Sequence, residues 1–224
     1  MDKQGLLSVV ATPIGNLEDI TLRALRTLKE VDYILCEDTR VTGKLLKHYE
    51  IATPVKRYDA HTSDNMHEKI LADLQSGKHL ALVSDAGTPG VSDPGVMLVN
   101  YARQAEIKIE AIPGPSAVTA SFSISGIMGN QFIFLGFVPQ KKGRATFFDS
   151  LSSYKVPVIF FESTHRIMKT LHALVTTHPD KQVLVARELT KLHEEVVSGT
   201  PLEVWQYFTD NEVHQKGEFV VMVH

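Results

Sequence analysis

Several features are scarce in this sequence of 224 residues, and each absence excludes a class of protein. Cysteine occurs once, at Cys36, which excludes an intramolecular disulfide and a cysteine-based metal site and favours a small buried side chain. The ten histidines form no HExxH pattern, so we expect no metal. No apolar run approaches the length of a membrane span, and the run of residues 6–11 is too short for a signal peptide. We therefore expect a cytoplasmic protein without a membrane segment.

An excess of positive charge is also missing. The sequence carries 23 lysines and arginines against 26 aspartates and glutamates, a net charge of −3. This balance gives no overall basic surface for nucleic acid, so any such partner must be held by local patches. The hydrophobic share of 43% and the charged share of 22% are ordinary for a globular protein with one large core or two modest ones.

Three common signatures of phosphate-binding or nucleophilic sites are not found. The sequence has no GxxxxGK[ST] phosphate loop, no GxGxxG after its first apolar run, and no GxSxG nucleophile elbow. These absences argue against a nucleoside triphosphatase, a dinucleotide-binding enzyme and a serine hydrolase of the elbow type.

One loop dominates what is present, the glycine- and proline-rich segment SDAGTPGVSDPG at residues 84–95. It follows the apolar run 79–83, which is typical of a buried strand in a parallel sheet. Pro94 suits the first position of a helix, with Asp93 as its N-cap. The loop therefore lies at the carboxyl end of a strand, where open α/β sheets bind ligands. The alternative is a turn that only reverses the chain.

Short apolar runs and helical patterns alternate through the first half of the chain, which predicts a parallel α/β sheet. The expected strands are residues 6–11, 31–36, 55–58, 79–83 and 107–112. The expected helices are a first one containing Ile20, Ala24 and Leu28 with Asp19 as N-cap, then 41–49, 64–76 and 94–105. We expect residues 1–115 to form a first domain.

A different pattern follows, which predicts a mixed sheet in a second domain of residues 116–224. A helix rich in small residues is expected from Ala117, and a basic turn at residues 139–144. The remaining expected elements are strands 132–137, 156–161, 182–186, 195–198 and 218–223, and helices 164–177 and 201–208.

Polar residues gather where the expected strands end, without the charges that a polyphosphate needs. Such loops suit a small ligand with a carboxylate, an amine, a ribose diol and an adenine, because backbone N–H groups, carbonyls and aspartates satisfy each of these. S-adenosylmethionine fits that description.

The same loops carry motifs that resemble one known family. They are ATPIGNLED at 11–19, EDTR at 37–40, residues 84–95, PGPSA at 113–117, FFESTHR at 160–166 and ARELTK at 186–191. Together, from about Leu6 to Val223, they resemble the ribosomal RNA small-subunit methyltransferase I family, a branch of the tetrapyrrole methylases that methylates a ribose 2′-oxygen of a 16S rRNA cytidine. Many relatives continue with a further C-terminal segment, which this sequence does not show.

The resemblance implies a homodimer of two-domain α/β chains with S-adenosylmethionine in a cleft between the domains. The cofactor contacts implied by the matching motifs are Pro13, Asp85, Ala86, Gly87, Thr88, Ser116, Ala117, Ala186, Arg187 and Glu218.

The reaction needs removal of the 2′-hydroxyl proton, and the sequence does not select the base. Position near strand ends makes Glu37, Asp38, Arg40 and Lys191 catalytic candidates, with Asp93 and Glu188 as further possibilities. Two alternatives stay open: Asp93 as a helix cap, and residues 37–40 as a capped helix start with a surface ion pair.

The expected partner is 16S rRNA in the small ribosomal subunit. The local positive charges best placed to bind it are Arg40, Lys141, Lys142, Arg144 and Arg166. For Arg166, covering a helix N-terminus is an equal alternative to a phosphate contact.

Two rival functions remain from the sequence. A sister enzyme of the same fold would methylate a tetrapyrrole or a protein, but we expect such enzymes to lack the EDTR and ARELTK motifs. A non-catalytic module that binds cofactor or RNA would not need so many charged residues at the strand ends.

Overall fold

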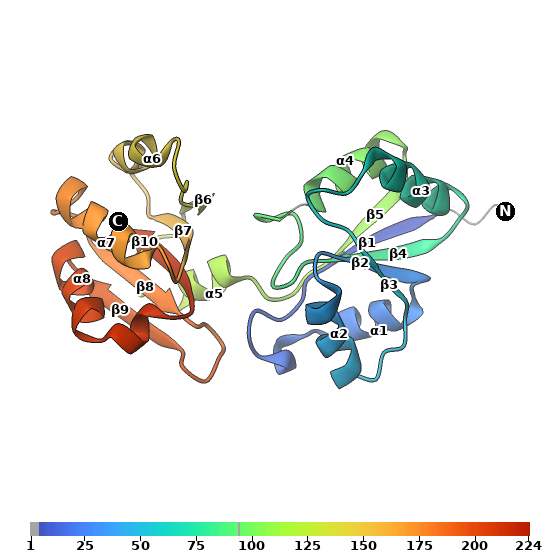
Figure 1. The fold of residues 1–224 in the computed structure, drawn as a ribbon, viewed down its shortest axis with the longest axis horizontal. Helices are drawn as coiled ribbons and strands as arrows, with labels where there is room; N and C mark the ends of the chain where they lie inside the picture. The colour runs from blue at the N-terminus through green and yellow to red at the C-terminus, as the bar shows by residue number, and fades with distance from the viewer. Residues whose placement is uncertain (1–4, 94) are drawn as a thin grey trace. The chain divides into compact units, whose positions relative to one another are not determined.

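The computed structural model of the chain describes residues 5–93 and 95–224, so the helix start predicted at Pro94 lies outside the described residues. The chain divides into two compact units, the first ending at Ser116 and the second beginning at Ala117, each built on a five-stranded sheet (Figure 1). This division lies one residue after the boundary expected from the sequence. No helix within the described ranges is long and apolar enough to cross a membrane.

The sheet of the first unit is entirely parallel, with strand order β3-β2-β4-β1-β5. The elements are β1 (Leu6–Val10), the 3-10 helix η1 (Leu17–Asp19), α1 (Leu22–Glu30), β2 (Tyr33–Cys36), α2 (Thr39–His48), β3 (Val55–Arg57), α3 (Asp64–Gln75), β4 (His79–Val83), α4 (Gly95–Gln104) and β5 (Lys108–Ile112). The predicted parallel α/β fold is confirmed. Parallel strands bring all five carboxyl ends to the same edge.

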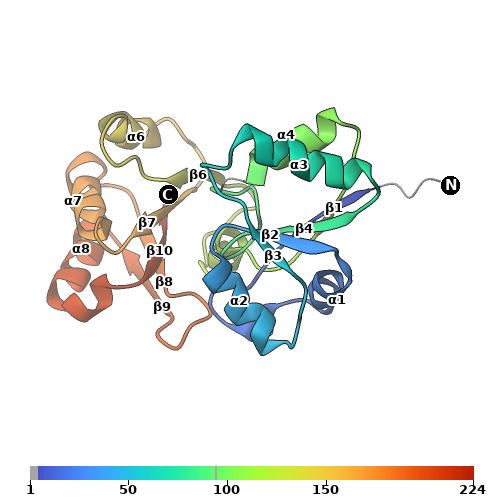
Figure 2. The same ribbon diagram turned by 45° about the vertical axis from the view of Figure 1, so that its right-hand side comes forward.

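Helices cover both faces of this sheet, α1 and α2 on one and α3 and α4 on the other (Figures 1 and 2). Because successive side chains of a strand point to opposite faces, Val10 packs toward α1 and α2 while Leu7 packs toward α3 and α4. Both side chains are fully buried, and each such burial contributes about 1.5–3 kcal/mol.

The predicted N-cap of the first helix is wrong. Asp19 ends the short η1 turn, which Asn16 caps by accepting a hydrogen bond from the Glu18 backbone. The N-cap of α1 is Thr21, whose hydroxyl accepts from the Ala24 N–H at 3.1 Å. The apolar spacing located the buried face of α1, but Ile20 adopts an extended backbone just before the helix begins.

The second unit has the mixed sheet that the sequence predicts, with strand order β6-β7-β10-β8-β9. Its elements are α5 (Ala117–Ser123), β6 (Ile133–Phe137), α6 (Arg144–Leu151), β7 (Val158–Ser163), α7 (Ile167–Thr177), β8 (Val183–Arg187), β9 (Glu195–Gly199), α8 (Pro201–Asp210), η2 (Glu212–Gln215) and β10 (Glu218–Val223). Strand β10 comes last in the chain but lies in the centre, antiparallel to both β7 and β8.

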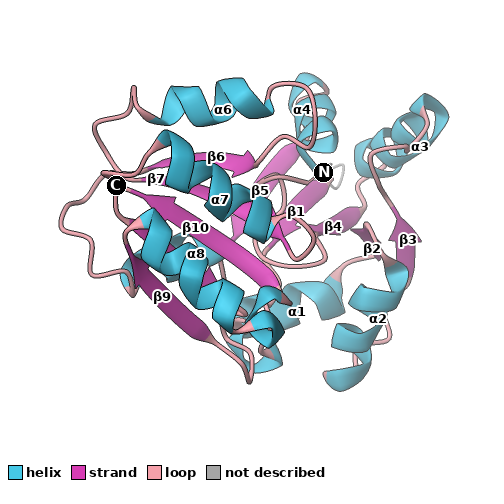
Figure 3. Cartoon of the chain, turned by 60° about the vertical axis from the view of Figure 1, so that its left-hand side comes forward, coloured by secondary structure: helices cyan, strands magenta, loops and turns pink. Residues whose placement is uncertain are grey.

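Helices α6, α7 and α8 pack on one face of this second sheet (Figure 3). The core there is built from large side chains such as Phe160 of β7, Leu171 of α7 and Phe208 of α8, all fully buried. Helix α6 was not predicted, because it is short and follows a turn in which Gly143 has a positive φ of 87°. Only Phe148 and Leu151 of α6 are buried, which leaves a weak periodic signal.

Candidate active site

Loops that follow β1 and β4 are bonded directly to each other at the carboxyl edge of the first sheet. The backbone of Thr12 donates to the Gly87 carbonyl at 2.9 Å and accepts from the Gly87 N–H at 3.0 Å. The Thr12 hydroxyl, which is buried, also donates to the carbonyl of Ser84 at 3.1 Å. Sequence reasoning gave Thr12 no role, although a threonine ending an apolar strand needs such a partner.

The loops after β2 and β5 join the same assembly. A carboxylate oxygen of Asp85 accepts from the Asp38 N–H at 3.1 Å, and the Thr88 hydroxyl donates to the Pro115 carbonyl at 3.4 Å. Gly114 permits the close approach, because a Cβ at this position would lie 3.0 Å from the Cβ of Ala11. Four strand-end loops thus form one connected rim.

This rim contains the cofactor residues predicted for the first unit. Pro13 and Gly87 are buried within it, Asp85, Thr88 and Ser116 are half-buried, and Ala86 is exposed. Gly87 has a φ of +77°, a conformation that favours glycine. A Cβ at this position would lie 3.5 Å from the Ile14 side chain and 3.8 Å from the Pro115 carbonyl oxygen. Ala117 begins α5 in the second unit.

Asp93 has a structural role in the central loop. Its carboxylate accepts from the N–H groups of Gly90 at 2.8 Å and Gly95 at 2.9 Å. Since Gly95 is the first residue of α4, this is the helix-capping alternative described above. The same bonds hold the loop closed.

Residues 37–40 form a capped helix start with a surface ion pair. Asp38 is the N-cap of α2 and accepts from the Arg40 N–H at 2.8 Å and from its guanidinium at 2.6 Å. The Arg40 guanidinium beside it holds the pKa of Asp38 well below its usual range. The Arg40 side chain is 87% exposed. Asp38 is therefore a poor proton acceptor.

The carboxylate of Glu37 differs from those of three aspartates at this edge. Asp38, Asp85 and Asp93 all accept hydrogen bonds, whereas Glu37 has neither a hydrogen bond nor an ion pair within residues 5–93 and 95–224. Glu37 is exposed, but the surrounding protein desolvates its carboxylate enough to raise its pKa, and the carboxylates of Asp85, Asp93 and Asp59 raise it further, against an opposing effect of Arg57. An unpartnered carboxylate with a raised pKa is suited to accept a proton.

A second group of predicted residues meets at the carboxyl ends of β7 and β8 in the second unit. Lys191 lies between two carboxylates, 2.8 Å from Glu188 and 2.9 Å from Glu218. Partial burial opposes the charge on Lys191, but the two carboxylates outweigh this effect and raise its pKa. Lys191 is thus a cation at neutral pH and does not act there as a base.

Arg187 is directed into its own unit. Its guanidinium donates to the Lys216 carbonyl at 2.7 Å and the His193 carbonyl at 3.3 Å, and lies 3.6 Å from Glu195. The residue is 7% exposed, and the neighbouring Ala186 is fully buried. These bonds hold the segment before β10 against the end of β8.

Two of the predicted RNA-binding arginines also point inward, to a carboxylate that sequence reasoning did not single out. The Glu162 side chain is completely buried, 2.9 Å from Arg166 and 3.7 Å from Arg144. The sequence did contain an indication of its role. Alternate residues of a strand face the same side of the sheet, so Glu162 of β7 faces the core together with Val158 and Phe160. A carboxylate in that position requires charged partners. Lys141 and Lys142 are exposed.

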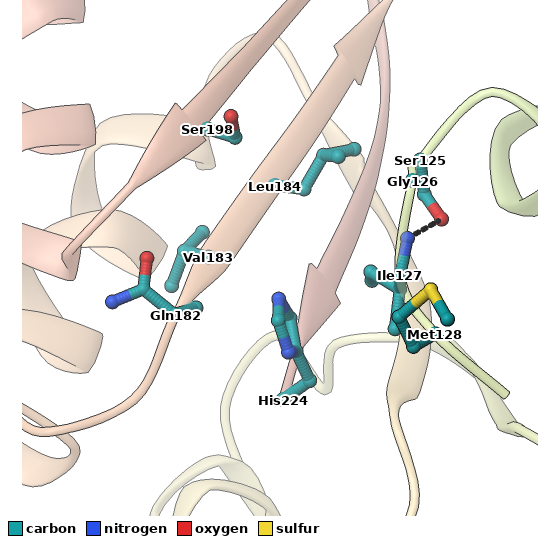
Figure 4. Close-up of a pocket in the computed structure, with 9 residues that line it drawn as sticks. All are labelled: Ser125, Gly126, Ile127, Met128, Gln182, Val183, Leu184, Ser198 and His224. Carbon is teal, nitrogen blue, oxygen red and sulfur yellow. Dashed lines mark hydrogen bonds between the residues drawn. The ribbon is translucent and has the colours of Figure 1, made fainter.

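A separate hollow of about 420 Å³ lies in the second unit, between the segment after α5 and the strand β8 (Figure 4). Its walls include Ile127, Met128, Leu184 and His224, and none of the predicted site residues lines it. In the part of the chain that the structure describes, no group of three or more histidine, cysteine, aspartate or glutamate residues is placed to hold a metal ion.

The sequence of residues 6–204 matches the family described as Tetrapyrrole (Corrin/Porphyrin) Methylases. A ribosomal RNA small subunit methyltransferase I of Thermotoga maritima is 45% identical over 204 residues, which cover 91% of this chain and 92% of that protein.

Solved structures share the fold at low sequence identity. A diphthine synthase has a TM-score of 0.73 at 14% identity, covering 97% of this chain and 89% of the other. A uroporphyrin-III C-methyltransferase from Thermus thermophilus, solved with S-adenosyl homocysteine, has a TM-score of 0.67 at 20% identity, covering 98% and 97%.

Proposed function

The chain belongs to the tetrapyrrole methylases and, within them, to the ribosomal RNA small subunit methyltransferase I family, and on that premise we propose that it methylates a ribose 2′-oxygen of a 16S rRNA cytidine. It is an S-adenosylmethionine-dependent methyltransferase. The observation that carries the proposal is the similarity at 45% identity over 91% of the chain, together with the connected rim of loops that holds the family motifs of the first unit.

The composition of the rim supports binding of this cofactor. The rim carries the half-buried carboxylate of Asp85 and the exposed Ala86, and Gly87 follows them in a conformation that favours glycine. We assign cofactor contacts to the residues inferred from the motifs, namely Pro13, Asp85, Ala86, Gly87, Thr88, Ser116, Ala117, Ala186, Arg187 and Glu218. For Arg187 the contact would come from its backbone, since its guanidinium is bonded internally.

S-adenosylmethionine supplies a methyl group on a sulfonium, which is already an activated leaving group. The protein must then align the ribose oxygen with the methyl group and remove the hydroxyl proton. We assign proton removal to Glu37, because it directly follows β2, its carboxylate has no hydrogen bond or ion pair with the described residues, and its pKa is raised. Asp38 is held as an anion by Arg40, and Lys191 is held as a cation by two carboxylates.

The proposed activity also indicates the RNA partner and the cellular location of the protein. An enzyme that modifies small-subunit ribosomal RNA works where ribosomes are assembled, so we place it in the cytoplasm. Whether the substrate is free rRNA or the assembled small subunit is decided by the experiment below. The homodimer implied by the family resemblance stays a prediction, which light scattering of the purified chain tests.

A methyl-transfer assay tests the function directly. The protein is incubated with methyl-labelled S-adenosylmethionine and either small subunits or free 16S rRNA from cells that lack this modification. The label should appear in a 2′-O-methylated cytidine after nuclease digestion. Label in a base or in ribosomal protein would assign the chain to a sister activity. Cofactor binding without transfer to any of these would indicate a non-catalytic module.

Replacing Asp85 by alanine should weaken cofactor binding by roughly fivefold or more. The reason is the loss of about 1 kcal/mol from a partner left unpaired, in addition to the lost support of the β2–α2 loop through the Asp38 N–H. Isothermal calorimetry in the presence of a chelator measures this effect. Parental affinity in a folded variant would limit Asp85 to shaping the turn.

A further inference from the structure

A basic loop of the second unit, residues 139–143, is fastened to the body of the domain by one buried ionic cluster. Two guanidiniums hold the start of the loop: Arg166 donates to the Val138 carbonyl at 2.7 Å, and Arg144 donates to the Pro139 carbonyl at 3.5 Å. Arg144 also ends the loop, as the first residue of α6. Both ends of the loop are therefore tied to the same pair of arginines.

Those arginines are in turn held by Glu162 and Thr170, which are both buried. Glu162 is 2% exposed and Thr170 is 0% exposed. Thr170 donates to Glu162 at 2.6 Å and accepts from Arg144 at 2.8 Å, while Arg166 lies 2.9 Å from the other carboxylate oxygen. The cluster links β7, α7 and α6, which are the elements around the loop.

The loop carries two lysine side chains that are exposed to solvent. Lys141 and Lys142 are exposed and have no ion pair among the residues that the structure describes. The cluster that holds the loop adds two arginines against one carboxylate, a net charge of +1. Such a surface complements a polyanion.

The position of the loop in the sheet is also informative. It follows β6, which runs parallel to β7, so it lies at the same edge as residues 163–166 after β7. Strands β7 and β8 are both antiparallel to β10, which brings Glu188 and Lys191 to that edge as well. The loop thus shares an edge with the motif residues of the second unit.

We propose that residues 139–143 form a preshaped phosphate-binding loop for the ribosomal RNA substrate, and that Glu162 and Thr170 are positioning residues that hold it in place. The proposal rests on the function proposed above and names the surface that the RNA backbone contacts. It replaces the prediction that the side chains of Arg144 and Arg166 bind phosphate themselves, since their guanidiniums are bonded internally.

The first test removes the charges. Lys141→Ala with Lys142→Ala should lower the affinity for undermethylated small subunits by about tenfold near 0.1 M salt and reduce the slope of log K against log salt by about 1.4, at about 0.7 per phosphate contact. The matched control is Lys155→Ala with Lys181→Ala, which removes equal charge before β7 and β8, at the opposite edge of the sheet. A parental salt slope in the loop variant would overturn the proposed surface.

The second test moves the loop without changing any charge. Thr170→Val removes the hydroxyl that joins Glu162 to Arg144 and so loosens the attachment of the loop. Because no charged group is lost, a smaller salt slope in this variant would come from displacement of Lys141 and Lys142. We expect affinity for the same subunits to fall several-fold with a reduced slope, while calorimetry gives the parental cofactor affinity. A folded Thr170→Val protein with the parental slope would overturn the positioning role. Failure of the parent protein to bind or methylate subunits would instead refute the proposed function.

Discussion

Replacing Glu37 by glutamine should lower the rate of methyl transfer by at least about a hundredfold, the lower end of what a general base contributes. Cofactor and RNA affinities should stay at their parental values, because glutamine keeps the shape of the side chain and the Glu37 carboxylate makes no hydrogen bond to the described residues that would be lost. Single-turnover transfer of labelled methyl groups to undermethylated subunits measures the rate. Glu30→Gln is the matched control, an exposed glutamate before β2 rather than after it.

The pH dependence separates a catalytic from a structural role for Glu37. The parental rate should fall as pH drops through the pKa of Glu37, at higher pH than for an ordinary glutamate, because desolvation by the surrounding protein and the nearby carboxylates of Asp85, Asp93 and Asp59 raise that pKa. The acid limb should disappear in Glu37→Gln. A parental rate and pH profile in that variant would assign proton removal elsewhere.

Glu37→Gln should lower the rate of methyl transfer but should not lower the stability of the fold. A carboxyl group whose folded-state pKa lies above its unfolded value stabilises the fold below the unfolded pKa, and this stability is lost as pH rises through the folded pKa. Ionised Glu37 therefore costs stability at neutral pH. Thermal unfolding of Glu37→Gln at neutral pH should occur at the parental temperature or above it.

Replacing Glu162 by alanine should destabilise the second domain by about 3 kcal/mol, the lower end for breaking a buried ion pair, since both arginines keep some contact with water. That loss corresponds to a melting temperature lower by about 6 °C or more. Circular dichroism during heating measures it. Lys78→Ala is the control, because Lys78 pairs with Asp73 at the surface and such pairs contribute at most about 1 kcal/mol.

An unchanged melting temperature for Glu162→Ala would show that the arginines find other partners. In that case the loop keeps its place without the cluster, and Thr170→Val should bind RNA with the parental salt slope, which overturns the positioning role. The two measurements therefore check one cluster through independent properties, stability and RNA affinity.

Features that depend on short stretches of chain were predictable from the sequence. Short apolar runs such as residues 6–11, separated by helical patterns, predicted strands of a parallel sheet, and Thr200 followed by Pro201 predicted the start of α8. The structure has a capping box there, in which Glu203 also bonds back to Thr200. Helix caps and apolar runs depend on residues that are close together in the sequence, so these elements could be predicted without knowing the fold.

The partners of charged side chains could not be predicted in the same way. Glu162 meets Arg144, 18 residues earlier in the chain, only because α6 packs beside α7. Arg187 likewise bonds the Lys216 carbonyl because β10 enters between β7 and β8. How elements pack on one another is a property of the whole fold, which explains why the inward bonding of Arg144 and Arg187 could not be predicted from the sequence.

The central position of β10 has a consequence for how the protein folds during synthesis. The first sheet is complete once β5 has left the ribosome, so the first domain can fold while the rest of the chain is still being made. The second sheet cannot close in the same order, because β7 and β8 have no shared neighbour until residues 218–223 emerge. Until then, the inner edges of β7 and β8 expose unpaired backbone groups to other nascent chains. The sheet of the second domain is therefore completed later than that of the first.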